Sequence, residues 1–310
     1  MTKQAPNTVV MVRPHHFHPN PQTLADNSFQ SSDYTADTKQ QARSAYAEVT
    51  EVARVLTNRG VTVELFEDET TITPDSVFPN NWFSTHDSGQ ILLYPMYAQN
   101  RRLERRHDIV QTLKTHYGFK GVVDLSYFEH DAMYLEGTGA LVLDHDKKLA
   151  YVALSNRAHK KPVHEFCELM GFDAVYFAAH NKNNVAVYHT NVMMAVTSDF
   201  VFLADAMIFN KSERNQVLNT IDRSGKKLVP LSEEQINRFA GNVLELDGKN
   251  GRFIAMSTSA FDALTQEQKR LIQTHVDIAH INIPTVELAG GSLRCMLAGI
   301  HLPPIEPTEK

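Results

Sequence analysis

Apolar residues along the chain recur as pairs of short runs separated by polar turns. Four such pairs occur, each opened by an Asn or a Gly, at residues 81–94, 139–155, 191–203 and 242–257. Short apolar runs bounded by turn-forming residues predict β-hairpins. The chain is therefore expected to contain at least four hairpins in succession.

A fifth pair is incomplete. It begins at Gly290 and continues as an apolar run to Ile300, and we expect its second strand to be Thr8–Val12 from the other end of the chain. The five units start at 81, 139, 191, 242 and 292, with spacings of 58, 52, 51 and 50 residues. A near-constant period of this size is typical of repeated supersecondary units in a closed array.

Helical patterns fill the gaps between the pairs. Residues 37–59 place Ala42, Tyr46, Val49, Ala53 and Leu56 on one face, before a stop at Gly60. The other helix signals are residues 101–117 before Gly118, the segment from Pro162 to Gly171, and the capping boxes of Ser232 with Gln235 and Thr265 with Gln268.

One helix between successive hairpins gives a ββαβ rhythm. We therefore predict an α/β fold made of five ββαβ units in a ring, which the pairing of the two chain ends closes. Closure removes free sheet edges, which is a physical reason for a ring. No linker rich in Pro, Gly and Ser divides the chain, so residues 1–310 are predicted to form a single domain. A doubly wound α/β sheet is the alternative.

Composition narrows the class of function. The net charge of -6 at pH 7 argues against a dedicated nucleic-acid-binding protein. No apolar stretch approaches the roughly 18 residues of a membrane span, and no signal peptide is expected at the Met1 end. The chain has only two cysteines, so we expect no disulfide framework and a cytoplasmic location.

Cys295 is the first candidate for chemistry. Gly290 and Gly291 precede it, and paired glycines let a backbone adopt unusual angles and approach a ligand closely. Arg294 adjoins it, and a neighbouring cation favours the reactive thiolate. A small buried residue on a strand is the alternative interpretation of a lone cysteine.

His189 and Glu136 occupy matching places at the starts of the third and second units. Histidine titrates in the range needed to hold or move the proton of a Cys nucleophile. Glu136 lies between apolar residues and glycines, where a perturbed pKa is common, although a turn-stabilising role stays open. In a ring the unit starts converge on one cavity, so we expect Cys295, His189 and Glu136 to meet there. Cys167 shares a helix face with Val163 and is predicted to pack in the core.

These segments resemble the guanidine-modifying, or pentein, superfamily, which includes arginine deiminases, dimethylarginine dimethylaminohydrolases and arginine–glycine amidinotransferases. Gly290–Met296 is similar to the Gly-rich Arg-Cys-Met segment that carries the nucleophile of arginine deiminases. Leu135–Gly139 is similar to a Glu-Gly-Gly-Asp motif, from whose last two positions Thr138 and Gly139 depart, and His189 falls between the two motifs as the family's catalytic His does. The resemblance covers about residues 9–302 and implies a five-bladed α/β propeller.

The resemblance also implies substrate contacts. Asp75 lies in a segment similar to the one whose Asp contacts substrate in dimethylaminohydrolases, and Arg157 matches an Arg that holds the substrate α-carboxylate. The opening residues 11–30 and residues 77–82 are most similar to the citrulline-utilisation hydrolase group. The other substrate-binding candidates are Asn80, Asn81, Asn191 and Arg294.

Amides replace carboxylates at the positions that bear on substrate choice. Asn80, Asn81 and Asn191 stand where deiminases and dimethylaminohydrolases carry acidic residues. A buried guanidinium favours carboxylates, whereas a neutral ureido group is matched by an amide, which both donates and accepts. We therefore expect a citrulline hydrolase that forms ornithine, ammonia and CO2 through a covalent Cys295 intermediate.

Other interpretations stay open. Within the superfamily they are an arginine or dimethylarginine deiminase or dimethylaminohydrolase, and then an amidinotransferase. Outside it they are a metal hydrolase using His15, His16 and His18, and a catalytically silent binding protein. The favoured scheme needs no metal and no organic cofactor. Its partner is a small amino-acid substrate, without nucleic acid or membrane, and self-association into a homo-oligomer is left open.

Overall fold

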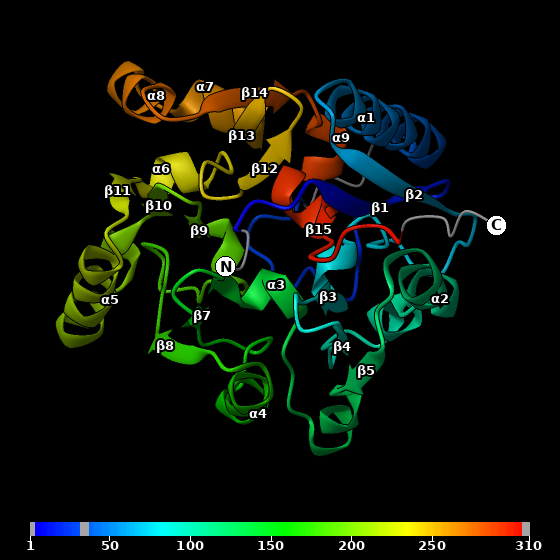
Figure 1. Ribbon diagram of the computed structural model, residues 1–310, viewed down its shortest axis with the longest axis horizontal. Coiled ribbons are helices and arrows are strands. Elements are labelled where there is room, and N and C mark those ends of the chain that lie inside the picture. Colours follow the sequence, from blue (N-terminus) through cyan, green and yellow to red (C-terminus); the bar gives the residue numbers. More distant parts are fainter. Residues whose placement is uncertain (1–3, 32–36, 306–310) are drawn as a thin grey trace.

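The computed structural model describes residues 4–31 and 37–305, and it shows five three-stranded sheets around a central axis (Figure 1). In each sheet the inner strand is antiparallel to the middle strand, and the middle strand is parallel to the outer one. From inner to outer strand the sheets are β15 (Ala298–Gly299), β1 (Thr8–Pro14) and β2 (Thr62–Asp68); β3 (Phe83–Thr85), β4 (Gln90–Leu93) and β5 (Gly121–Asp124); β6 (Val142–Asp144), β7 (Leu149–Ala153) and β8 (Asp173–Phe177); β9 (Met194–Val196), β10 (Phe200–Leu203) and β11 (Lys227–Pro230); and β12 (Leu244–Gly248), β13 (Gly251–Ser257) and β14 (Asp277–Ile281). The fold is the five-bladed α/β propeller expected from the sequence.

The α-helices of six or more residues connect the middle strand of each blade to its outer strand and lie at the periphery of the ring (Figure 1). A parallel pair of strands needs such a crossover, because a tight turn only joins antiparallel strands. The α-helices are α1 (Thr38–Asn58), α2 (His107–Tyr117), α3 (Gly137–Ala140), α4 (Lys160–Met170), α5 (Lys211–Ser224), α6 (Glu233–Ile236), α7 (Thr258–Ala263), α8 (Gln266–Gln273) and α9 (Pro284–Glu287). Both predicted capping boxes are present, at the starts of α6 and α8.

The two ends of the chain close the ring within one blade, as predicted. Val9 pairs with Gly299 and Val10 with Ala298 in antiparallel register. On its other side β1 runs parallel to β2 over its full length, so the N-terminal strand is central in its sheet. The last inner strand therefore has a partner only because the first strand of the chain reaches it.

Apolar burial is divided among the blades rather than gathered in one centre. Each hydrophobic cluster joins strands of one blade to its crossover helix or to the next blade. All four residues of β10 are buried, which is typical of a strand covered on both faces. Among the described residues, no helix has the length and apolar character needed to cross a membrane.

The residues that were predicted to start the units lie in turns before the strands and not in the strands themselves. Residues 139 and 140 end the short helix α3, and the inner strand begins only at Val142. Asn81 and Asn191 likewise lie in single turns of 3-10 helix, η1 (Pro79–Asn81) and η4 (Thr190–Val192), before their strands. These turns aim side chains across the end of the sheet, which a strand residue cannot do.

Two helix predictions need correction. Residues 101–117 form a 3-10 turn, η2 (Asn100–Glu104), and then α2, because Arg105 is extended and its guanidinium binds Glu129. In α1 the buried face is rotated by about one residue from the prediction. Val49 and Leu56 are buried, whereas Ala42, Tyr46 and Ala53 are half-buried and the other buried positions are Gln41, Ala45 and Val52.

Candidate active site

Short turns precede the inner strands β3, β6, β9 and β15. The side chains of these turns meet at one end of the central axis. Besides η1, α3 and η4, the turn η6 (Leu293–Met296) leads into β15. The turns pack so closely that Gly139 has no room for a side chain. A Cβ there would lie 2.4 Å from Asn81 Nδ2 and 2.8 Å from His189 Nδ1. The glycine thus lets residues from three blades approach one another.

A small cavity lies where these turns meet. Cys295, His189, Asn81, Asp75 and Arg157 line it together. Its volume is about 10 Å³, which is room for about one water molecule. A ligand larger than a water molecule needs more room than this volume. The structure thus brings together five of the nine predicted site residues at one small cavity.

Cys295 is buried between two asparagine amides. Its Sγ accepts hydrogen bonds from Asn191 Nδ2 at 3.3 Å and from Asn242 Nδ2 at 3.2 Å. The Asn242 amide also donates to the carbonyl of Asn191 at 3.0 Å, so the two side chains hold each other in place. Donors aimed at sulfur stabilise its charged form. The arrangement suits a thiolate nucleophile.

His189 and Glu136 form a buried pair. His189 Nε2 lies 2.7 Å from Glu136 Oε2, and the other carboxylate oxygen accepts from the backbone N–H of Tyr97. Burial would raise the pKa of Glu136, but Arg157, the His189 hydrogen bond and Arg101 together hold it well below its usual range. Burial lowers the pKa of His189, against the opposing pull of Glu136. The pair is therefore a carboxylate and a neutral imidazole, which can accept a proton.

Glu136 stands behind His189 rather than in the cavity wall. Two guanidinium groups flank it, Arg157 Nη1 at 3.4 Å and Arg101 Nη1 at 3.7 Å. The backbone N–H of Glu136 donates to the carbonyl of Arg157 at 3.0 Å, which ties the two segments together. Glu136 therefore orients and polarises His189.

Asp75 supplies a carboxylate to the cavity wall. Its Oδ2 accepts from Asn20 Nδ2 at 2.8 Å and lies 3.6 Å from Arg101 Nε. Its Oδ1 is buried and has no hydrogen-bond partner among the described residues. Burial raises the pKa of Asp75, and Arg101 opposes that rise. An unpaired buried oxygen at a cavity is suited to accept an N–H group from a ligand.

The two neighbouring asparagines of η1 have different roles. Asn81 lines the cavity and its Oδ1 accepts from Arg101 Nη1 at 2.8 Å. Asn80 is outside the cavity wall: its amide donates to Thr138 Oγ1 at 3.3 Å, and its Oδ1 accepts from Asn81 at 3.1 Å. Asn80 therefore orients Asn81 instead of facing the cavity.

Arg157 and Arg294 are separated by the structure. Arg157 lines the cavity, donates from Nε to Asp26 Oδ2 at 3.0 Å, and stacks 4.8 Å from the ring centre of Tyr188. The side chain of Arg294 instead lines a second cavity on the axis, although Arg294 adjoins Cys295 in sequence. The structure thus does not place Arg294 at the cavity where substrate contact was expected.

Two residues of the site were not predicted. Arg101 is buried, lines the cavity and binds Glu104, which no repeat or motif indicated. Burial raises the pKa of Glu104 to about 8, against the pull of Arg101. Asn242 could have been found, because it opens the fourth unit as Asn191 opens the third.

Cys167 and His15 lie outside the site and make contacts that are unrelated to it. Cys167 is packed in a hydrophobic cluster on α4, as predicted, and burial raises the pKa of its thiol to about 11. His15 Nε2 binds Glu67 Oε2 at 2.9 Å. Over the ranges 4–31 and 37–305, no group of three or more His, Cys, Asp or Glu side chains is arranged to hold a metal.

The amide of Asn242 can be tested through thiol reactivity. In a Cys167→Ser background, we expect Asn242→Ala to slow alkylation of Cys295 by iodoacetamide about fivefold at pH 7, because the thiolate loses one of two donors. Asn237→Ala, an exposed residue at the end of α6, is the matched control. An unchanged rate in Asn242→Ala would show that this amide does not stabilise the thiolate.

Comparison with known proteins agrees with this fold. No curated protein matches the sequence. Full-length ArgZ without ligand, an arginine dihydrolase of the ornithine–ammonia cycle in cyanobacteria, has a TM-score of 0.74 at 13% identity, over 96% of this chain. This chain spans only 41% of that protein. The N-terminal domain of ArgZ, as a cysteine-to-serine variant bound to its substrate, gives 0.74 at 14% identity, covering 96% of this chain and 98% of the domain.

A smaller enzyme is similar over its whole length. DDAH from Pseudomonas aeruginosa, as a cysteine-to-serine variant complexed with citrulline, gives a TM-score of 0.65 at 14% identity, with 97% of this chain and 100% of that one covered. The family described as "N,N dimethylarginine dimethylhydrolase, eukaryotic" matches residues 13–302. The chain therefore belongs to that family, within the pentein superfamily of arginine-modifying hydrolases.

Proposed function

We propose that this protein hydrolyses the ureido group of citrulline, through a covalent intermediate on Cys295, to ornithine, ammonia and CO2. The observation that carries the proposal is the cavity wall beside the nucleophile. Asn81 and the buried cation Arg101 line this wall together with Asp75, and the amides of Asn191 and Asn242 donate to Cys295 Sγ from outside the cavity. This surrounding suits a neutral reacting group better than a cationic one.

Charge pairing inside the site supports the same choice. Glu104 is engaged by Arg101, Asp26 by Arg157, and Glu136 by His189 and both arginines. Asp75 is then the one carboxylate of this group with an unpaired oxygen. A guanidinium in the cavity would have to share carboxylates that already hold Arg101 and Arg157, because only Asp75 has an oxygen without a partner. A buried cation left without a partner costs several kcal/mol, roughly 3–5.

The chemistry follows from the contacts of the dyad. Cys295 attacks the ureido carbon as a thiolate, and its proton is taken by the neutral imidazole of His189, which Glu136 stabilises as it becomes charged. His189 then gives this proton to the departing nitrogen of ornithine, which leaves an S-carbamoyl group on the sulfur. Water, deprotonated by His189, attacks that carbon and releases carbamate, which decomposes to ammonia and CO2.

The first test is a direct assay of citrulline with product identification. We expect release of ornithine and ammonia by the wild-type chain, and loss of at least a thousandfold in kcat for Cys295→Ser, because an alcohol is far less nucleophilic than a thiolate. Cys167→Ser, which removes the other cysteine, should keep full activity. Turnover of arginine or methylated arginines with none on citrulline would refute the substrate assignment.

A second candidate substrate is arginine. The similar protein ArgZ is an arginine dihydrolase, and complete hydrolysis of a guanidino group passes through a ureido compound. The unpaired oxygen of Asp75 is the specific feature that could meet a guanidinium. If arginine is consumed through citrulline to ornithine, both hydrolyses occur here. If arginine is left unchanged, the site is limited to the ureido group.

Asn81→Asp tests the charge argument. The substitution keeps the size of the side chain and adds a negative charge to the cavity wall, so the ratio of kcat/KM for arginine to that for citrulline should rise by about tenfold or more. Asn80→Asp is the matched control, since Asn80 is outside the cavity wall and should shift this ratio less. An unchanged ratio in Asn81→Asp would mean that this position does not select the charge of the substrate.

The pH profile tests the protonation state of His189. Burial lowers its pKa below the ordinary 6.5, so the imidazole stays neutral, and able to accept a proton, down to that pH. The acid limb of kcat/KM for citrulline should therefore have its midpoint below pH 6.5, because a neutral ureido group does not titrate there. An acid limb centred above pH 7 would show that His189 is charged in the resting protein.

A further inference from the structure

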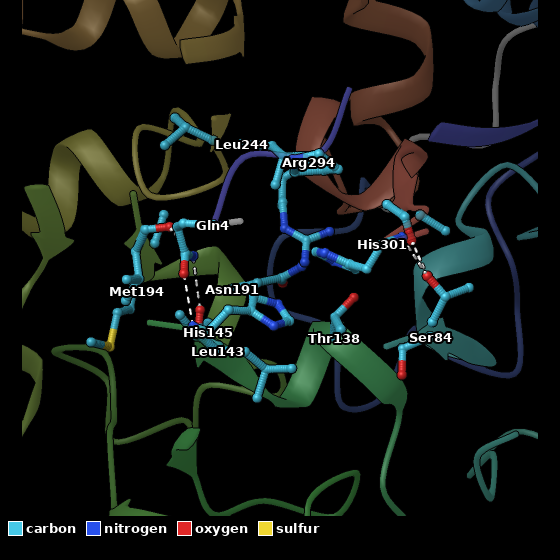
Figure 2. Close-up of a pocket in the computed structure, with 18 of the residues that line it drawn as sticks. Gln4, Ser84, Thr138, Leu143, His145, Asn191, Met194, Leu244, Arg294 and His301 are labelled. Atoms are coloured by element: carbon cyan, nitrogen blue, oxygen red, sulfur yellow. Dashed lines mark hydrogen bonds between the residues drawn. The ribbon is translucent and has the colours of Figure 1, made fainter. Parts of the chain in front are cut away.

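A second cavity lies on the axis of the ring, and all five inner strands contribute to its wall (Figure 2). Its volume is about 60 Å³, and it shares no lining residue with the cavity at Cys295. Gln4 partly closes it, because its amide donates to the carbonyls of Leu143 and Val196 and accepts from the backbone N–H of His145. The cavity is thus a built feature of the closed ring.

The charged side chain of this cavity is Arg294, whose guanidinium points into its centre (Figure 2). None of the residues that line the cavity is Asp or Glu. Within the described ranges Arg294 makes one hydrogen bond, from Nη1 to the carbonyl of Leu297 at 3.1 Å, and no ion pair. Burial lowers the pKa of Arg294 to about 10, which leaves it cationic at pH 7. A half-buried cation that has no Asp or Glu partner in its cavity attracts an anion.

Neutral donors surround this cation. The ring centroids of His145 and His301 lie 4.4 Å apart at the cavity wall, and the hydroxyl of Thr138 is beside these rings (Figure 2). Burial, with Arg294 and Lys148, lowers the pKa of His301 to about 4 although Asp87 opposes this, and burial with His301 and His86 lowers that of His145. Both imidazoles are therefore uncharged at pH 7, and neither adds a charge that competes with Arg294.

The axial cavity is close to the nucleophile through two links. Arg294 and Cys295 are consecutive in η6 and face the two different cavities. Asn191 lines the axial cavity, and its amide donates to Cys295 Sγ at 3.3 Å. A charge placed beside Arg294 therefore acts on the sulfur across about one side chain of low-dielectric protein.

We propose that the axial cavity binds a small monovalent anion, of the size of chloride, bromide, nitrate or bicarbonate, on the Arg294 guanidinium, and that the bound anion weakens the support that Arg294 gives the Cys295 thiolate. The volume excludes nucleotides and other large anions, and the single cation favours a single negative charge. The anion would lower the reactivity of the nucleophile without occupying the substrate cavity. The binding step is independent of which substrate the enzyme uses.

Bromide is the probe for binding, since its anomalous scattering identifies its position. Crystals of the full chain soaked in sodium bromide should show an anomalous peak within hydrogen-bond distance of the Arg294 guanidinium, and crystals of Arg294→Gln should lack it. Arg294→Lys, which keeps the charge, should retain a peak there. The site is refuted if bromide appears beside surface arginines but not in this cavity, or if the peak survives in Arg294→Gln.

Thiol reactivity tests the effect on the nucleophile. In a Cys167→Ser background at pH 7, alkylation of Cys295 by iodoacetamide should be about threefold slower in sodium bromide than in sodium gluconate of equal ionic strength, because gluconate is too large to enter. Arg294→Gln should react slowly in both salts, whereas Arg238→Gln, an exposed arginine, should behave as the parent. Equal rates in both salts for the parent, or a bromide effect that persists in Arg294→Gln, would overturn the coupling. No assay here uses citrulline, so a negative result is separable from failure of the proposed function.

Discussion

The pairing of β15 with β1 is the contact on which the site depends. Only two residue pairs join these strands, yet they close the ring between residues almost 300 positions apart. Cys295 lies three residues before β15, so its position relative to the other blades is set by this closure. If the ends separated, His189 and Glu136 would still face each other, but the sulfur would have no fixed place beside them. The position of Cys295 in the site thus depends on the pairing that closes the ring.

The buried arginines of the site are neutralised by carboxylates of the protein itself and do not need a charged group from the substrate. Glu136, Glu104 and Asp26 each have an arginine partner, so the buried arginines are held without a ligand. Removing one partner of such a pair leaves an uncompensated charge, which is why these groups resist rearrangement. What is left for a ligand is a set of amides and one free oxygen on Asp75. The charge that a ligand meets in the cavity is therefore set by carboxylates and arginines that are already paired with each other.

The sequence was sufficient to predict the repeat and the convergence of Cys295, His189 and Glu136, because the pattern that places them is local. Alternating apolar runs and turns repeat about every 50 residues, and the candidates stand at the same place in their units. Asn242 stands at that place too, but it was not predicted as a site residue. Arg101 was beyond reach, because it comes from the connection between β4 and α2, away from the unit starts on which the prediction relied.

The direction in which a side chain points was the second feature that could not be predicted from the sequence. Arg294 was expected at the substrate cavity because it adjoins Cys295, but consecutive residues of a tight turn point to different sides. The same reason separates Asn80 from Asn81, of which only the second lines the cavity. Proximity along the chain therefore gives the neighbourhood of a residue but not the compartment that its side chain enters.

Because consecutive side chains of a turn point to different sides, the ring has two compartments with different chemistry. The inner strands are too short to fill the axis, so a cavity remains along them, while the turns at one end enclose a separate cavity around the sulfur. Both compartments contact η6, so the field in one acts in the other across the protein between them. A propeller of this kind can therefore place a charged group behind its nucleophile, out of reach of the substrate. Arg294 occupies that position, and the charge of whatever accompanies it in the axial cavity determines how much of its field the thiolate experiences.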